Sequence, residues 1–136
     1  MALNKVFAYD ERKVRVRTVP AGTKVGAGIL VNGRPAFVIA ANTGETHDTT
    51  LPDGTVISAP VTGVGLDENE ASVAFDGSFE TAVTGATTST GQDVAVYITS
   101  AGALTLTSTD NTLFGYTDYP KGYVKVAGRA VVRIGE

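Results

Sequence analysis

The side chains that could carry out chemistry are few and scattered in this chain. The segment around the single histidine contains Glu45, His47, Asp48 and Asp53, whose nitrogen and oxygen atoms are donors of the kind that bind metal ions. A protein metal site needs three or four convergent ligands, and a lone histidine in a polar segment is more often solvated. Cysteine is absent, which excludes a thiolate site and a disulfide framework. The sequence therefore predicts no metal site.

Catalytic arrangements are equally hard to identify. No Ser-His-Asp order or paired-carboxylate set stands out, although spacing alone leaves acids such as Asp76 and Glu80 open. The glycines between Gly22 and Gly28 resemble a phosphate loop only superficially, because the sequence contains neither GxxxxGK[ST] nor GxGxxG. We therefore expect a protein that is not an enzyme, with no catalytic residues and no cofactor.

The clearest chemical feature is positive charge near the start of the sequence. Residues 1–24 carry six basic and two acidic side chains, whereas residues 25–117 carry one basic and ten acidic ones. Residues 118–136 carry four basic and two acidic side chains, and the net charge of the chain is −3. This distribution can steer docking or self-association, and its plainer interpretation is a set of solvated strand faces. The candidate contacts with a partner surface or with another protomer are Lys5, Arg12, Lys13, Arg15 and Arg17.

The segment 13–17 indicates how part of this charge would be positioned. Valine alternates with basic residues here, which predicts a strand with Val14 and Val16 toward a core and the cations outward. Outward charge also protects an edge strand from unwanted pairing. A more specific interpretation of these basic residues is nucleic-acid binding. However, no aromatic residue lies between them, and the net charge of the whole chain is negative. We expect no nucleic-acid partner.

The stretch 72–98 organises the predicted fold. Its apolar residues alternate in three short runs, separated by turn signals at Asp76-Gly77 and in the segment 84–91. Asn32-Gly33 is the strongest short hairpin signal of the chain. By contrast, the segment 42–54 is polar and is predicted to be a loop that ends in an Asp-Gly turn.

These patterns predict an all-β protein. A helical period never persists for ten residues, and a composition rich in Val, Thr, Ala and Gly favours strands and turns. About ten short strands should form a β-sandwich or a small β-barrel, with Phe75 and Phe79 in the core. Residues 1–136 are predicted to be a single β domain, in which residues 1–12 could form an extended N-terminal arm. Signal-peptide and membrane-spanning patterns are missing, so we expect no membrane partner.

With these segments in place, the sequence resembles a family of small tailed-bacteriophage proteins that decorate or cement capsids. Some members of that family are labelled as RecA/RadA-type recombinases. The resemblance extends over most of residues 5–117 and departs from the family pattern in a longer segment around 42–67. The motifs that carry it are the turn Val19-Pro20-Ala21-Gly22, the segment 26–33, the run 73–79, the run 90–97 and Leu113-Phe114-Gly115-Tyr116.

The resemblance implies a jelly-roll-like β-sandwich. It also implies a structural protein that binds the outer surface of an HK97-like phage head and stabilises contacts between major capsid protein subunits. Its partners would be the major capsid protein and itself, with a homodimer favoured and a homotrimer as the alternative. It would be made in the host cytoplasm and located on the outside of the virion. The recombinase label implies ATP hydrolysis, which needs a Walker lysine and hydroxyl on a phosphate loop, and the sequence has neither.

A second function stays open at this point. The chain could be a carbohydrate- or surface-binding β-sandwich module of a virion. Four tyrosines would then form an exposed platform: Tyr97, Tyr116, Tyr119 and Tyr123. Packing in the core or at an interface is the plainer role for these rings.

Overall fold

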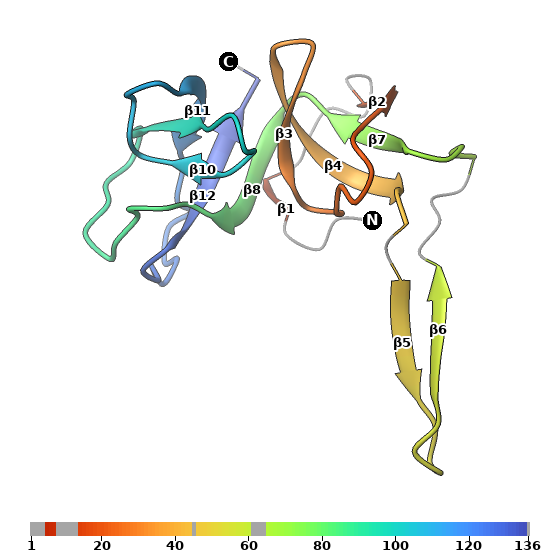
Figure 1. Cartoon of the computed structure of the whole chain (residues 1–136). Helices are drawn as coiled ribbons and strands as arrows, with labels where there is room; N and C mark the ends of the chain where they lie inside the picture. Colours follow the sequence, from red (N-terminus) through yellow and green to blue (C-terminus); the bar gives the residue numbers. More distant parts are fainter. Residues whose placement is uncertain (1–4, 8–13, 45, 61–64, 136) are drawn as a thin grey trace.

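The computed structural model describes residues 5–7, 14–44, 46–60 and 65–135 (Figure 1). These residues form twelve β-strands, and the described part of the chain contains no helix. The all-β prediction is therefore confirmed. A helix long and apolar enough to cross a membrane is accordingly not found among the described residues.

Six strands form the larger sheet, in which every neighbouring pair is antiparallel. In spatial order they are β1 (Lys5–Phe7), β8 (Gly77–Ala82), β12 (Arg129–Ile134), β11 (Thr112–Thr117), β9 (Ala95–Ile98) and β10 (Leu104–Thr105). The register between β11 and β9 shifts between Leu113 and Gly115, as at a β-bulge. This places Leu113 at the surface, 45% exposed, while the next residue, Phe114, is buried.

A second, four-stranded antiparallel sheet packs beside the first. Its order is β2 (Val14–Thr18), β7 (Glu70–Ala74), β4 (Arg34–Asn42) and β3 (Gly28–Val31). β3 and β4 are joined by the predicted hairpin turn, in which Asn32 and Gly33 have φ values of 50° and 80°. Positive φ at both central residues is the requirement of a type I′ turn, so this prediction is confirmed.

The chain passes from one sheet to the other within the stretch 72–98. β7 lies in the four-stranded sheet and β8 in the six-stranded one, with only Phe75 and Asp76 between them. Gly77 has a φ of 103°, which permits the sharp change of direction. The three strands predicted here are β7, β8 and β9.

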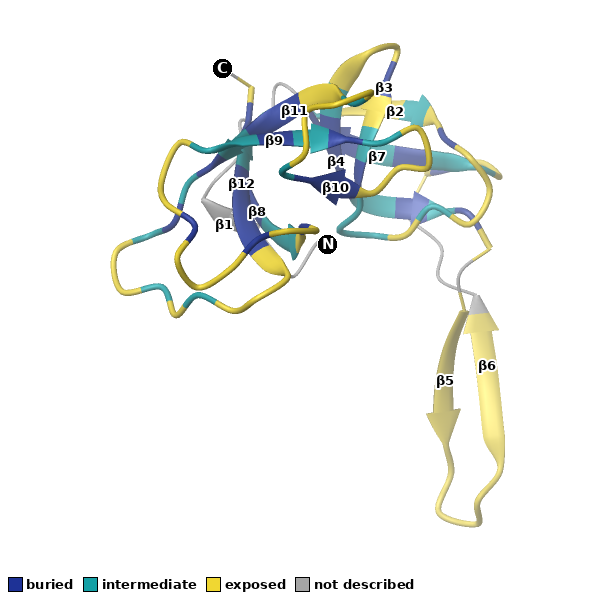
Figure 2. Cartoon of the chain, turned by 60° about the vertical axis from the view of Figure 1, so that its left-hand side comes forward, coloured by how far each residue is buried: buried dark blue, intermediate teal, exposed yellow. Residues whose placement is uncertain are grey.

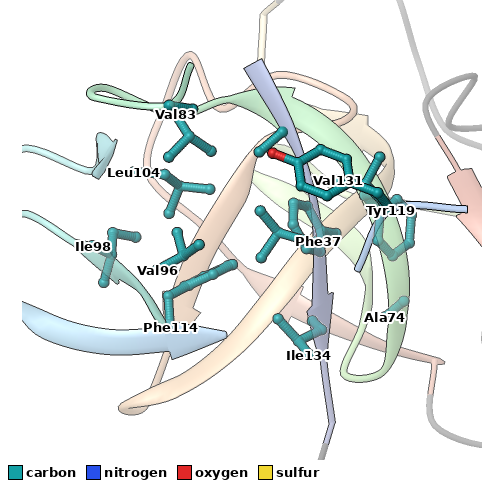
Figure 3. Close-up of a cluster of buried hydrophobic side chains, with 14 residues drawn as sticks. Phe37, Ala74, Val83, Val96, Ile98, Leu104, Phe114, Tyr119, Val131 and Ile134 are labelled. Atoms are coloured by element: carbon teal, nitrogen blue, oxygen red, sulfur yellow. The ribbon is translucent and has the colours of Figure 1, made fainter. Parts of the chain in front are cut away.

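The core lies on both faces of the four-stranded sheet. Phe37 and Val38 are neighbours in β4, both are fully buried, and they belong to different clusters. The first cluster fills the space between the sheets, where the Phe37 ring contacts those of Phe79 and Phe114 at centroid distances of 4.4 and 5.5 Å (Figure 3). The second cluster, on the other face, comprises Val19, Val31, Ala36, Val38, Ala41, Ala71, Val73 and Phe75. Phe75 and Phe79 are both buried, as predicted, but in different clusters.

The remaining two strands, β5 (Thr46–Thr50) and β6 (Val56–Pro60), form a separate antiparallel hairpin that projects from the body (Figures 1 and 2). Residues 46–59 are all exposed. The prediction of a loop over 42–54 is therefore wrong for residues 46–50. The predicted Asp53-Gly54 turn does close the hairpin, with the Leu51 N–H donating to Thr55 O at 2.7 Å.

Candidate interaction surfaces

The hairpin of β5 and β6, which we call the arm, has two different faces. Residues opposite each other in an antiparallel pair share a face, and successive residues alternate. The cross-strand pairs Asp48–Ser58 and Thr50–Val56 therefore lie on one face, which we call the acidic face. The pairs His47–Ala59 and Thr49–Ile57 lie on the other, the histidine face. Val56 and Ile57 are 56% and 50% exposed, so each face presents one large apolar side chain to solvent.

The arm is also negatively charged. The sequence of residues 42–60 contains three acidic side chains and no lysine or arginine. Asp53, at the tip, accepts a 2.9 Å hydrogen bond from the Thr55 N–H, and this bond holds the pKa of the Asp53 carboxyl below its usual value. Asp48 accepts a hydrogen bond from the Ser58 hydroxyl on the acidic face. The carboxyl group of Asp53 is therefore ionised at neutral pH.

Two arginines surround Phe75 at the second face of the four-stranded sheet. The guanidinium carbon of Arg34 lies 4.3 Å from the centroid of the Phe75 ring, and that of Arg17 lies 5.9 Å from it. Attraction between a cation and an aromatic face holds such a guanidinium in place, while its N–H edge can still bind a carboxylate. We call Arg17, Arg34 and Phe75, with the groove beside them, the arginine surface.

The groove of the arginine surface lies between the end of β2 and β3. It has a volume of about 440 Å³ and is lined by residues 17–20 on one side and 29–32 on the other. Leu30, at its edge, is 36% exposed. A second groove of about 450 Å³ begins at Gly33 and includes Arg34, Phe75 and Tyr116. Arg17 therefore lines one of two shallow, partly apolar grooves, and Arg34 lines the other.

The structure separates the predicted contact residues. Arg15 and Arg17 lie on β2, at the edge of the four-stranded sheet, and each donates a 2.8 Å hydrogen bond to the carbonyl of the preceding valine. Lys5 lies on β1, in the other sheet, where its backbone is opposite Phe79. Arg12 and Lys13 lie outside the described residues. Residues 1–12 were predicted as a possible extended N-terminal segment, but within it β1 is paired with β8.

The alternation predicted for β2 is confirmed for Val14, which faces the core, and wrong for Val16 and Arg17. Val14 packs against the first cluster, but Val16 is 47% exposed and Arg17 is half-buried. The reason is that both faces of this sheet are covered, so the aliphatic stem of an arginine can lie over Phe75. Arg34, the other half of the arginine surface, was not among the predicted residues. The available signal was its position directly after the Asn32-Gly33 turn.

The four tyrosines do not form one exposed platform. Tyr119 is buried and the other three are half-buried. The rings of Tyr119 and Tyr123 contact each other at a centroid distance of 5.4 Å and pack against the first cluster. Burial and a 2.8 Å hydrogen bond to Glu80 raise the pKa of Tyr123 to about 12, and burial also raises the pKa of Tyr119. Packing is the role that the geometry gives to Tyr119 and Tyr123.

The other candidate catalytic and metal-binding residues either form polar contacts within the fold or lie apart from one another. Glu80 accepts from Tyr123 and also pairs with Arg129 at 3.2 Å, a contact that ties β8 to β12. His47 and Asp48 lie on opposite faces of the arm. Within the described ranges, no group of three or more histidine, cysteine, aspartate or glutamate side chains could hold a metal ion.

Comparison of the chain with protein-family models, with curated proteins and with solved structures finds no match.

Proposed function

We propose that this protein is a structural capsid decoration protein, which binds the outer surface of a tailed-phage head and stabilises contacts between major capsid protein subunits. It would be made in the host cytoplasm and act on the virion. The sequence resemblance described above suggests this role. The observation that carries the proposal is the arm.

An isolated two-stranded hairpin is only marginally stable in water, because neither face is covered. The arm places Val56 on one face and Ile57 on the other, both at least half exposed. No described residue of the body covers residues 46–59. Burying each of these side chains against a partner would stabilise the bound arm by about 1 kcal/mol or more.

A hairpin that presents an exposed apolar side chain on each face fits between two surfaces rather than on top of one. A seam between two shell subunits offers such a site, and many copies bound around a shell would add their effects through multivalency. The rigid body behind the arm, with its two core clusters, would then remain outside the seam. This arrangement supports a cementing role.

The test is co-sedimentation with empty shells assembled from the cognate major capsid protein. Wild-type protein should sediment with the shells and raise the temperature at which they disrupt. In a variant lacking the arm, residues 46–60 are replaced by two glycines, a short link that suits the paired positions Thr46 and Pro60 at its base. This variant should fold but lose most of its occupancy. If wild-type protein stays in the supernatant, the proposal fails, and a glycan array then tests the surface-binding alternative.

A further inference from the structure

We infer that the acidic face of the arm docks on the arginine surface of a second copy of this chain. The inference concerns the protein free in solution, where the arm is not inserted in a seam of a shell, so it goes beyond the shell binding proposed above and can be tested without shells. It joins two surfaces of the same molecule, each of which lacks a partner of opposite charge within the described residues.

The charge pattern of the sequence supports this pairing. Residues 14–34, which form β2, β3 and the start of β4, contain four basic side chains and no acidic one. Residues 42–60, which contain the arm, have three acidic side chains and no basic one. These segments follow each other in the chain with only β4 between them. Opposite charge of this kind both attracts and orients two copies.

The arginines of the two sheets differ in their ion pairs. On the six-stranded sheet, Arg129 pairs with Glu80, and Arg133 lies 3.2 Å from Asp93 and 3.7 Å from Asp118. Arg17 and Arg34, by contrast, have no carboxylate partner among the described residues. Each instead has the Phe75 ring as its neighbour. Arg17 Nη1 donates to Val16 O, but a guanidinium has five N–H donors, so both arginines keep N–H groups for a carboxylate.

The arm of one copy cannot use the whole arginine surface of its own chain. β4 has nine residues and leads from Arg34 at its first position to the arm beyond its last. At about 3.3 Å per residue, its ends are separated by up to roughly 30 Å. The arm continues away from the sheet (Figures 1 and 2). Asp48 and Asp53 form no ion pair within the described part of the chain. The contact must therefore be made between copies.

The two surfaces also match in their apolar content. Val56 lies on the acidic face, together with Asp48, and can enter the groove lined by residues 29–32 while the carboxylates meet the guanidiniums. Ile57 is on the histidine face and points away from this contact. In a two-fold dimer, each copy would give its arm and receive the other, which makes two equal contacts.

The first experiment measures self-association by analytical ultracentrifugation and light scattering, without shells. Wild-type protein should form a closed oligomer that dissociates as salt rises, because exposed charge pairs are screened. The double variants Arg17→Glu/Arg34→Glu and Asp48→Arg/Asp53→Arg should each be monomeric, with unchanged circular dichroism. Mixed together, these two variants should form a hetero-oligomer, because every arm then meets a surface of opposite charge.

The second experiment uses two neighbouring residues as a matched pair. Val56→Thr should weaken self-association by about tenfold, since it removes an apolar group from the buried face. Ile57→Thr, on the other face of the same strand, should leave the dissociation constant unchanged. Equal effects of the two substitutions would show that they act on the hairpin itself, and would overturn the proposed orientation.

Three further results would overturn the inference. They are a wild-type protein that stays monomeric at high concentration and low salt, an oligomer that survives both charge reversals, and mixed variants that fail to associate. If removal of the arm abolishes shell binding but leaves the oligomer intact, the partner of the arm is a shell subunit. That outcome would end this inference and leave the proposed function standing.

Discussion

The Tyr123 hydroxyl donates a 2.8 Å hydrogen bond to Oε2 of Glu80, although the two residues are 43 positions apart in the chain. The Tyr119 ring packs beside Tyr123, but its own buried hydroxyl has no hydrogen-bond partner among the described residues. These two neighbouring phenols therefore differ in the hydrogen bonding of their hydroxyl groups. This difference gives a direct test of the packing in the first cluster.

Replacing these tyrosines with phenylalanine should have opposite effects. Tyr123→Phe should lower the free energy of unfolding by about 1 kcal/mol, because a hydrogen bond to a carboxylate is lost. Tyr119→Phe should raise it by up to about 1 kcal/mol, because a buried hydroxyl without a partner is removed. Urea denaturation of both variants measures the two values. A loss above about 1 kcal/mol for Tyr119→Phe would mean that its hydroxyl is hydrogen-bonded.

Stability should decline at alkaline pH. In the unfolded chain a tyrosine releases its proton near pH 10, whereas burial and Glu80 raise the pKa of folded Tyr123 to about 12. Between these values the folded protein holds more protons than the unfolded chain, so the free energy of unfolding falls as pH rises. Denaturation curves between pH 9 and about 12 measure this slope. In Tyr123→Phe the decline should be shallower, and an unchanged slope would assign it to other groups.

Gly115 should tolerate no side chain. It lies at the β-bulge of β11, and a Cβ atom here would overlap the carbonyl oxygen of Arg133 and approach Ile134 Cγ2 to 3.0 Å. Gly115→Ala should therefore cost about 1–3 kcal/mol. Gly91 is the matched control, because its φ is ordinary and nothing lies within 4 Å of its Cβ position. Gly91→Ala should be neutral or stabilise by up to about 1 kcal/mol. Similar losses in thermal unfolding for both variants would contradict this packing.

The arm should contribute little to the stability of the body. Where burial is described, over residues 46–59, every arm residue is exposed and none belongs to either core cluster. Replacing residues 46–60 by two glycines should therefore change the free energy of unfolding of the isolated monomer by less than about 1 kcal/mol. Chemical denaturation at low protein concentration measures this change in the free energy of unfolding. A large loss would show that the hairpin stabilises the body and would weaken the argument that it is built for a partner.

Local patterns were sufficient for much of the fold. Asn32-Gly33 predicted its turn from residue types alone, because both positions need positive φ. The alternation around Phe75 and Phe79 identified two core residues, although it could not show that the chain changes sheets between them. That information depends on contacts distant in sequence.

The sequence did not predict strand β5 of the arm. A strand is recognised by alternation between a buried and an exposed face, and neither face of the arm is buried. Thr46–Thr50 is polar throughout and exposed on both faces, so it lacks the alternation that identifies a half-buried strand. Only one of the two arginines of the arginine surface was predicted, for a similar reason. Arg17 belonged to a visible basic segment, whereas Arg34 is significant only because Phe75, 41 positions later, lies beneath it.

The position of β12 has a consequence for how the protein is made. This strand comes last in chain order among the described strands, yet it lies between β8 and β11, inside the six-stranded sheet. The sheet cannot be completed until β12 has been synthesised, so the facing edges of β8 and β11 are unpaired in a shorter nascent chain. Folding of this sheet should be slow, as expected when long-range pairings dominate. A chain cut short before Arg129 would present two unpaired strand edges, which makes premature termination products candidates for aggregation and degradation.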